Sequence, residues 1–181
     1  MRVISGTSRG RKLVPLKGLK VRPTSDRARE AVFNILGSRV RNAHVLDLFA
    51  GTGALGIEAL SRGAASAFFM DKDCATVRKN IEICRFSNVS KIFEQDLIGS
   101  DFPPDVLNKT FDIIFMDPPY GEKLIETVLK KSHFLELLAP DAVIFAEHGH
   151  KENIAIPVHG LDISRQKKYS KTKISIINQF Q

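Results

Sequence analysis

The chain has 181 residues, of which 43% are hydrophobic and 26% charged, and a formal net charge of +7. The length suits one three-layer domain, and the lack of a long apolar run or of a charged-then-apolar N-terminus argues against a membrane span or a secretory signal, so we expect a cytoplasmic protein. Residues 1–29 carry nine Lys or Arg against one acid, and residues 165–173 carry five against none, which favours a phosphate-binding face over a generic solvated surface.

Residues 1–20 alternate short apolar runs around a glycine-containing turn, a pattern that predicts a β-hairpin. The turn lies between Gly6 and Gly10 and carries Arg9 and Arg11. Two strands alone are only marginally stable, so we expect this hairpin to pack on the body of the protein or on a partner.

Helical and strand patterns alternate after the hairpin. The expected helices span 28–36 (N-cap Thr24 or Ser25, end at Gly37), 55–62, 74–86 and 122–138. The expected strands span 45–49, 65–71, 92–95, 111–117 and 142–147, followed by a closing pair of strands around Ile163 and over 172–177. Repeated βα units that end in a hairpin predict an α/β fold, with a mostly parallel sheet, helices on both faces and an antiparallel edge.

Side chains that could bind a metal ion are few and dispersed. Cys74 and Cys84 fall in one predicted helix, about 15 Å apart, which excludes a disulfide between them. His148 and His150 flank a glycine without a third ligand nearby, so we interpret them as loop residues. We expect no metal site.

The segment Val45–Gly56 predicts a buried strand, a tight turn and the start of a helix. Its glycines, Gly51, Gly53 and Gly56, permit positive φ and close approach of a ligand, and the helix start offers unpaired N–H groups. This is a cofactor cradle. The same spacing matches the dinucleotide fingerprint, so the glycines alone do not identify the ligand.

Four predicted strands carry or precede an acid near their carboxyl ends, where ligands of such sheets bind. Asp47 lies in the first strand, Asp71 ends the second, Asp96 follows the third and Asp117 ends the fourth. Asp71 is placed to accept hydrogen bonds from ribose hydroxyls, and Asp96 lies beside the base. An acid at Asp47 would repel a pyrophosphate but favour an ammonium and a sulfonium, which predicts S-adenosylmethionine as the cofactor.

Asp117-Pro118-Pro119-Tyr120 follows an apolar strand. Asp-Pro is also common turn chemistry, but beyond the fourth strand of such a fold the prolines stiffen the loop and leave acceptor oxygens around one point. Asp117 and the Pro118 carbonyl could accept both N–H hydrogens of an exocyclic amino group and favour its pyramidal, nucleophilic form. Tyr120 would stack on the base, which must be flipped out of its helix.

These motifs resemble the bacterial family that methylates N2 of guanine 966 in 16S ribosomal RNA. The matching stretches are residues 2–6, 9–13, 22–24 with 27, 29–30 and 33–34, then 45–60, 117–120 and 165–172, the last with Ser170 where the family pattern has glycine. The resemblance implies a Rossmann-like methyltransferase with a seven-stranded sheet, in which the segment 22–24 and the following helix close over the methionine end of the cofactor. It divides the chain into an RNA-contacting hairpin, 1–20, and a methyltransferase domain, 21–181.

The resemblance also implies the site residues. The catalytic residues are Asp117, Pro118, Pro119 and Tyr120. The cofactor-binding residues are Asp47, Phe49, Gly51, Thr52, Gly53, Asp71, Lys72, Asp96, Leu97 and Thr24. The expected RNA contacts are Arg9, Arg11, Lys12, Arg22, Lys167 and Lys168, and the expected partner of the monomer is 16S ribosomal RNA, within the 30S subunit or its assembly intermediate.

Three other interpretations stay open at this point. The catalytic motif is shared with adenine-N6 and cytosine-N4 methyltransferases, so a DNA or RNA amino-methyltransferase of that kind is the first. A nicotinamide-dependent oxidoreductase would share the glycine pattern, but it requires an acid-free pyrophosphate site. A non-catalytic RNA-binding protein would leave residues 117–120 without a role.

Overall fold

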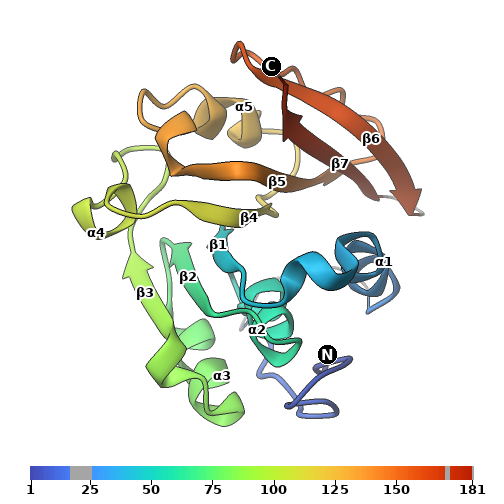
Figure 1. Ribbon diagram of the computed structural model, residues 1–181, viewed down its shortest axis with the longest axis vertical. Helices are drawn as coiled ribbons and strands as arrows, with labels where there is room; N and C mark the ends of the chain where they lie inside the picture. The colour runs from blue at the N-terminus through green and yellow to red at the C-terminus, as the bar shows by residue number, and fades with distance from the viewer. Residues whose placement is uncertain (17–25, 170–171, 181) are drawn as a thin grey trace.

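The computed structural model describes residues 1–16, 26–169 and 172–180 and contains one seven-stranded sheet (Figure 1). Its strand order is β3-β2-β1-β4-β5-β7-β6. The bounds are β1 (His44–Leu48), β2 (Ser66–Asp71), β3 (Ser90–Glu94), β4 (Phe111–Met116), β5 (Leu138–Gly149), β6 (Leu161–Tyr169) and β7 (Thr172–Gln179). The first five strands are parallel, and β7 is antiparallel to both β5 and β6. The expected α/β sheet with an antiparallel edge is confirmed.

Helices lie on both faces of the sheet. They are α1 (Asp26–Leu36), α2 (Ala54–Ser61), α3 (Ala75–Cys84), α4 (Pro104–Leu107) and α5 (Leu124–Leu129), with 3-10 turns at Gly37–Val40, Ser87–Val89 and Leu135–Leu137. Side chains of α1, α2 and α3 share one core with Phe115 and Phe145, whereas α4 and α5 share the other with Ile114 and Met116. This alternation along β4 and β5 produces the three layers. None of the described helices has the length and apolar character needed to cross a membrane.

The expected single helix over 122–138 is wrong. α5 ends at Leu129, a 3-10 turn follows at Leu135–Leu137, and β5 already begins at Leu138. Phe134 and Leu137 are buried in the second core, so the chain after α5 must turn inward before it enters the sheet. Pro140 has no N–H for the ladder, and Asp141 has a φ of +61°, which accounts for a register shift near the start of β5.

The crossover between β1 and β4 defines the binding edge of the sheet. From β1 the chain moves outward through β2 and β3, then returns to pair β4 on the other side of β1. Ligands of doubly wound sheets bind beyond the carboxyl ends of the strands at such a switch point. We call this side the carboxyl edge and the opposite side, where α2 and α3 end, the amino edge.

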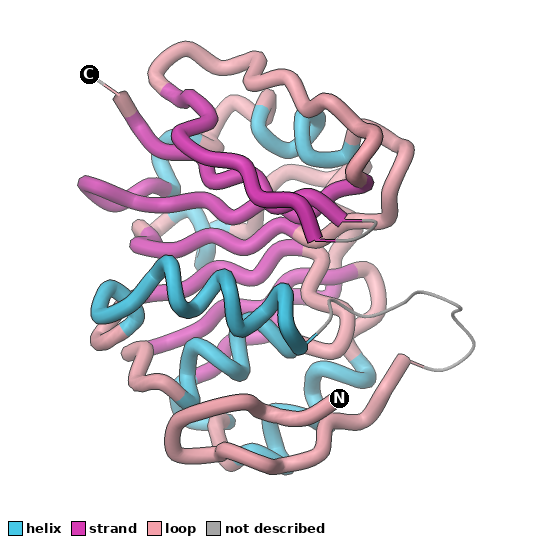
Figure 2. Tube along the Cα trace, turned by 90° about the vertical axis from the view of Figure 1, so that its right-hand side faces the viewer, coloured by secondary structure: helices cyan, strands magenta, loops and turns pink. Residues whose placement is uncertain are grey.

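The N-terminal segment, residues 1–16, packs on α2 and α3 (Figure 2). Its two arms meet through one β-bridge between Arg2 and Lys12, and Val3 and Leu13 are buried in the first core. The expectation that this hairpin packs on the body is confirmed. The proposed cap residues Thr24 and Ser25 lie outside the described residues.

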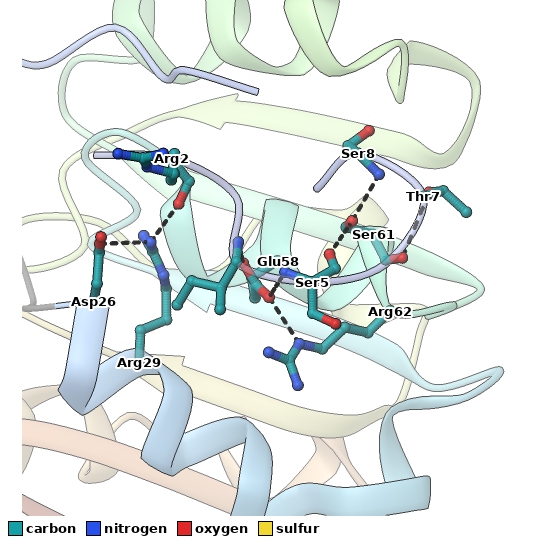
Figure 3. Close-up of polar contacts among 10 residues, drawn as sticks. Arg2, Ser5, Thr7, Ser8, Asp26, Arg29, Glu58, Ser61 and Arg62 are labelled. Atoms are coloured by element: carbon teal, nitrogen blue, oxygen red, sulfur yellow. Dashed lines mark hydrogen bonds and ion pairs between the residues drawn. The ribbon is translucent and has the colours of Figure 1, made fainter. Parts of the chain in front are cut away.

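Buried side chains replace a regular ladder in holding this segment (Figure 3). Glu58 of α2 is 1% exposed, and its carboxylate accepts hydrogen bonds from the backbone N–H groups of Ile4 (2.7 Å) and Ser5 (3.0 Å). It also accepts one from Nε of Arg62 at 2.7 Å. Arg29 of α1 is completely buried and donates to the carbonyl of Arg2 at 2.6 Å.

Candidate active site

The glycine turn after β1 is held by hydrogen bonds to the end of the neighbouring strand β2. The N–H of Gly51 donates to Oδ2 of Asp71, at the end of β2, at 2.8 Å. Gly53 has a φ of +75° at the N-cap of α2, and a Cβ there would lie 2.5 Å from the side chain of Val77. Glycine is therefore required at position 53 by both backbone conformation and space.

Asp47 lies beneath this turn. The side chain is 2% exposed, and its Oδ2 accepts a hydrogen bond from the N–H of Gly56 at 2.8 Å. Burial raises the pKa of Asp47 to about 8, although the Gly56 hydrogen bond opposes the shift. Asp47 thus fixes the start of α2 and places a titratable carboxyl next to the cradle.

The other predicted cofactor residues differ in how far their side chains are buried. Phe49 and Thr52 are half-buried beside the turn, Lys72 and Asp96 are exposed after β2 and β3, and Leu97 is buried in the second core. Oδ1 of Asp96 accepts a hydrogen bond from the N–H of Ile98 at 2.9 Å, which orders the loop after β3. Thr24 lies outside the described residues.

The predicted catalytic corner follows β4, which pairs with β1. Asp117 is half-buried, Pro118 is buried, and Tyr120 is 46% exposed. The Tyr120 hydroxyl donates to Oε1 of Glu147 at 3.0 Å and lies 3.0 Å from the hydroxyl of Thr172. Burial and the Glu147 carboxylate raise the pKa of Tyr120 above its ordinary value, so its hydroxyl stays protonated at neutral pH.

A cavity of about 240 Å³ adjoins this corner between α5 and the end of β5. Pro118 and Tyr120 form part of its wall, and three carboxylates, those of Glu126, Glu147 and Glu152, line it as well. Lys123 also lines the cavity, but three carboxylates outnumber its one ammonium, so the lining suits a flat ring with N–H donors better than it suits a phosphate.

The expectation that His148 and His150 are loop residues is wrong for His148, which also lines this cavity. His148 lies in β5, is 1% exposed, and has its Nε2 2.8 Å from the hydroxyl of Ser175 in β7. Burial lowers its pKa, so the ring is neutral at pH 7. Across the described ranges, no three His, Cys, Asp or Glu side chains are grouped as a metal site.

The predicted RNA contacts fall into two groups that the structure does not bring together. Arg9 and Arg11 lie at the tip of the N-terminal segment, where Ser8 bonds to the last residue of α3 and Thr7 to the last residue of α2. That tip lies at the amino edge. Lys12 is exposed on the same segment, whereas Lys167 and Lys168 are exposed on β6 near the carboxyl edge. Arg22 lies outside the described residues.

The sequence does not predict one polar residue at the site. Asn80 of α3 is fully buried and donates to the carbonyl of Thr52 at 2.8 Å, while its side chain also bonds both the N–H and the carbonyl of Val14. Glu147, at the end of β5, lies where the sequence suggests the border of a substrate pocket, one strand beyond the Asp117 corner at a parallel-strand carboxyl end.

The chemistry of this edge fits a cationic cofactor. Asp47, Asp71, Asp96 and Asp117 stand at or beyond the ends of four adjacent strands, and no Lys or Arg follows the glycine turn before Arg62. A pyrophosphate on this turn would face the side chain of Asp71, whose Oδ2 already accepts a hydrogen bond from Gly51. A sulfonium and an ammonium would instead be attracted by the acids at Asp71, Asp96 and Asp117, so the residues present fit S-adenosylmethionine.

Comparison with known proteins gives a consistent result. The model of the family described as Conserved hypothetical protein 95 matches residues 1–178. The "Putative rRNA methyltransferase YlbH" of Bacillus subtilis is 35% identical over 179 residues, which are 97% of this chain and 97% of that protein. "Ribosomal RNA small subunit methyltransferase D" of Escherichia coli K12 is 36% identical over 152 residues, covering 81% and 74% of the two chains.

Solved structures agree with the fold. The structure described as "Putative methyltransferase yhhF from Escherichia coli" superposes with a TM-score of 0.80 at 32% identity and covers 99% of this chain and 97% of that chain. A SAM-dependent methyltransferase from Streptococcus mutans gives a TM-score of 0.61 at 18% identity, over 84% of this chain and 48% of its own. At that identity the second likeness shows the fold alone.

Proposed function

This chain belongs to the Conserved hypothetical protein 95 family, and on that premise we propose that it methylates the N2 amino group of guanine 966 in 16S ribosomal RNA. Ribosomal RNA methylation is the activity named for the similar proteins of B. subtilis and E. coli. The methyl donor is S-adenosylmethionine, which supplies an electrophilic methyl group on a sulfonium. The base and the position rest on the resemblance and on the chemistry of the corner.

One observation carries the proposal: the Asp117–Tyr120 corner ends the strand that pairs directly with β1, whose glycine turn forms the cofactor cradle. The two motifs therefore lie at the same edge, on adjacent strands of the switch point. Neighbouring strands are about 4.8 Å apart, so an acceptor group on one and a methyl donor on the other can meet.

The residues of the corner act by positioning and hydrogen bonding. Asp117 and the carbonyl of Pro118 accept the two hydrogens of the amino group, which localises the nitrogen lone pair for in-line attack on the methyl group. The nitrogen–carbon bond forms as the carbon–sulfur bond breaks, and the excess proton leaves to Asp117 or water. Tyr120 stacks on the base, and its bonded hydroxyl fixes the ring.

The lining of the adjacent cavity favours guanine. The Watson–Crick edge of guanine offers N1–H and N2–H donors side by side, whereas adenine offers an N6–H donor next to an acceptor nitrogen. Glu147 places a carboxylate beside the corner, and a carboxylate accepts but cannot donate. Adenine N6 or cytosine N4 remains the alternative target of the same motif.

The test is transfer of labelled methyl groups to 16S ribosomal RNA and to 30S particles from cells that lack this protein, with the product nucleoside identified. N2-methylguanosine at position 966 is the expected product. Methyladenosine or methylcytidine would replace the guanine assignment with the alternative target. A protein that binds the RNA but transfers no methyl group to either substrate would contradict the proposed activity.

A further inference from the structure

A second cavity lies on the face of the sheet that carries α1, away from the catalytic corner. It has a volume of about 250 Å³ and lies between the C-terminal end of α1 and the β5–β7–β6 part of the sheet. Ile35, Val143 and Ile176 give it an apolar lining, and Arg39, Arg165 and Asn178 give it polar groups.

The cavity exists because α1 covers only part of this face. Phe33 of α1 packs on Phe115 of β4, with ring centroids 5.8 Å apart, and Phe115 packs on Phe145 of β5 at 6.0 Å. None of the described helices crosses β6 and β7 on this side (Figure 2). Ile176 of β7, which is 5% exposed, therefore borders the cavity beside α1.

The polar groups of the cavity are arranged to receive a ligand. Arg39 donates to the backbone carbonyl of Asp141, which holds its guanidinium at the rim. Arg165 is exposed on β6. Oδ1 of Asn178 is buried and accepts no hydrogen bond from any described residue. A buried acceptor without a donor is costly, and a ligand N–H would relieve that cost.

The register of the edge strands links this cavity to the catalytic corner. Arg165 pairs with Ile176, Lys167 with Ile174, and Tyr169 with Thr172. Cross-strand partners share a face, so Arg165 and Lys167 line the α1 side of β6, at every second position. The row ends at Tyr169, opposite Thr172 of β7, whose hydroxyl lies 3.0 Å from that of Tyr120. About 13 Å of strand separates Arg165 from Tyr169.

We propose that this cavity binds a nucleotide of the substrate RNA that flanks the target guanine, an inference that rests on the proposed function. Arg165 contacts the phosphate, the base packs against Ile35 and Ile176, and Asn178 accepts a hydrogen bond from the base. Lys167 contacts the next phosphate toward Tyr120. Two cations beside the aliphatic side chains of one cavity match a nucleotide, which joins an anion to a flat ring. An apolar peptide would leave both arginines without a counter-charge.

The experiment measures affinity for naked 16S ribosomal RNA and for 30S particles over a range of salt, together with methyl transfer at saturating substrate. Arg165→Glu is compared with Lys130→Glu, which reverses an exposed charge next to α5, on the opposite face of the sheet. For Arg165→Glu we expect at least tenfold weaker RNA binding and a salt slope smaller by about 0.7–0.9, with nearly unchanged cofactor affinity. Equal behaviour of the two variants would overturn the inference.

Asn178→Ala provides a second, independent measurement. If Asn178 were merely structural, its removal would not affect RNA binding. If it reads a base, the variant binds RNA several-fold more weakly while its melting temperature stays equal or rises, because a buried acceptor without a partner has been removed. Unchanged RNA affinity would refute this role. Loss of binding to 30S particles but not to naked RNA would identify a protein occupant and overturn the RNA assignment.

The two proposals can fail separately. If the wild-type protein methylates guanine 966 but Arg165→Glu behaves like Lys130→Glu, only the nucleotide site is wrong. If the wild-type protein methylates no RNA, while Arg165→Glu still weakens RNA binding, the proposed reaction is wrong and the binding site stands.

Discussion

The two basic regions of this chain, the N-terminal segment and the β6–β7 pair, are attached to the body in different ways. The first has a single β-bridge and is held by buried side chains of α1, α2 and α3. The second is held by continuous backbone pairing, β6 with β7 and β7 with β5. Both carry clustered Lys and Arg in the sequence, but only the second ends beside Tyr120.

Charge density therefore does not identify the face that meets the reacting base. The tip of the N-terminal segment contacts the ends of α2 and α3 at the amino edge, whereas the end of β5 that bears Glu147 pairs with the first residues of β7. If substrate RNA contacts both the tip of the N-terminal segment and β6, it must extend from one edge of the sheet to the other. Each prediction below tests one side of this comparison.

The largest effect is expected at the carboxyl edge. Asp117→Ala removes an acceptor for the reacting amino group and should lower the transfer rate by about 10²–10³-fold, as loss of one transition-state hydrogen bond does elsewhere. RNA affinity should stay close to that of the wild type, as measured by titration of labelled RNA. A parallel fall in affinity and rate would mean that Asp117 binds RNA and does not act in catalysis.

The next effect concerns how the N-terminal segment is held. Glu58→Ala leaves the N–H groups of Ile4 and Ser5 without their acceptor and should lower the free energy of unfolding by about 2–4 kcal/mol. Glu82→Ala, at an exposed position of α3, is the matched control and should change it by less than about 0.5 kcal/mol. Denaturant unfolding measures both. Equal stabilities would mean that the segment is only loosely associated with α2.

Asp47 links stability to pH at the binding edge. Its folded-state pKa of about 8 lies above the ordinary 3.8, so between these values the native state holds a proton that the unfolded chain has released. The contribution of Asp47 to the free energy of unfolding is therefore largest below pH 4. It falls by up to about 1.4 kcal/mol per pH unit as the pH rises toward 8. Asp47→Asn keeps an acceptor for Gly56 and should remove this slope in unfolding curves at pH 5, 6 and 7. A persistent slope would assign it to other groups.

The parts of this site that could be predicted are those that local sequence determines. The glycine turn, the acids after each strand and the 117–120 corner follow from strand–turn–helix patterns, because each needs only its neighbours in the chain. Asn80 and Glu58 could not be predicted in this way. Their partners, Val14 and Ile4, lie 66 and 54 positions away, so their roles arise only when the sheet and its helices assemble.

Tyr120→Phe probes the contact that joins the corner to the edge strands. The variant keeps the stacking ring but loses both hydroxyl contacts, to Glu147 and Thr172, and should lower kcat about tenfold, which corresponds to one hydrogen bond of about 1.4 kcal/mol. KM for the RNA should change little. Steady-state kinetics of Tyr120→Phe and Tyr120→Ala separate the contribution of the ring to kcat from that of the hydroxyl. If Tyr120→Phe is as slow as Tyr120→Ala, the hydroxyl accounts for the whole effect and stacking of the ring for none.

The smallest effect is expected at the amino edge. Arg9 is exposed at the tip of the N-terminal segment, so Arg9→Ala should not affect folding, and it should weaken RNA binding at most by the loss of one phosphate contact. The salt slope would then fall by about 0.7–0.9, with kcat unchanged. Lys167→Ala supplies the comparison at the other basic region. If both variants lower the slope, the RNA spans both edges. If only Lys167→Ala does, the RNA is confined to the carboxyl edge, and the positive charge of the N-terminal tip has no part in substrate binding.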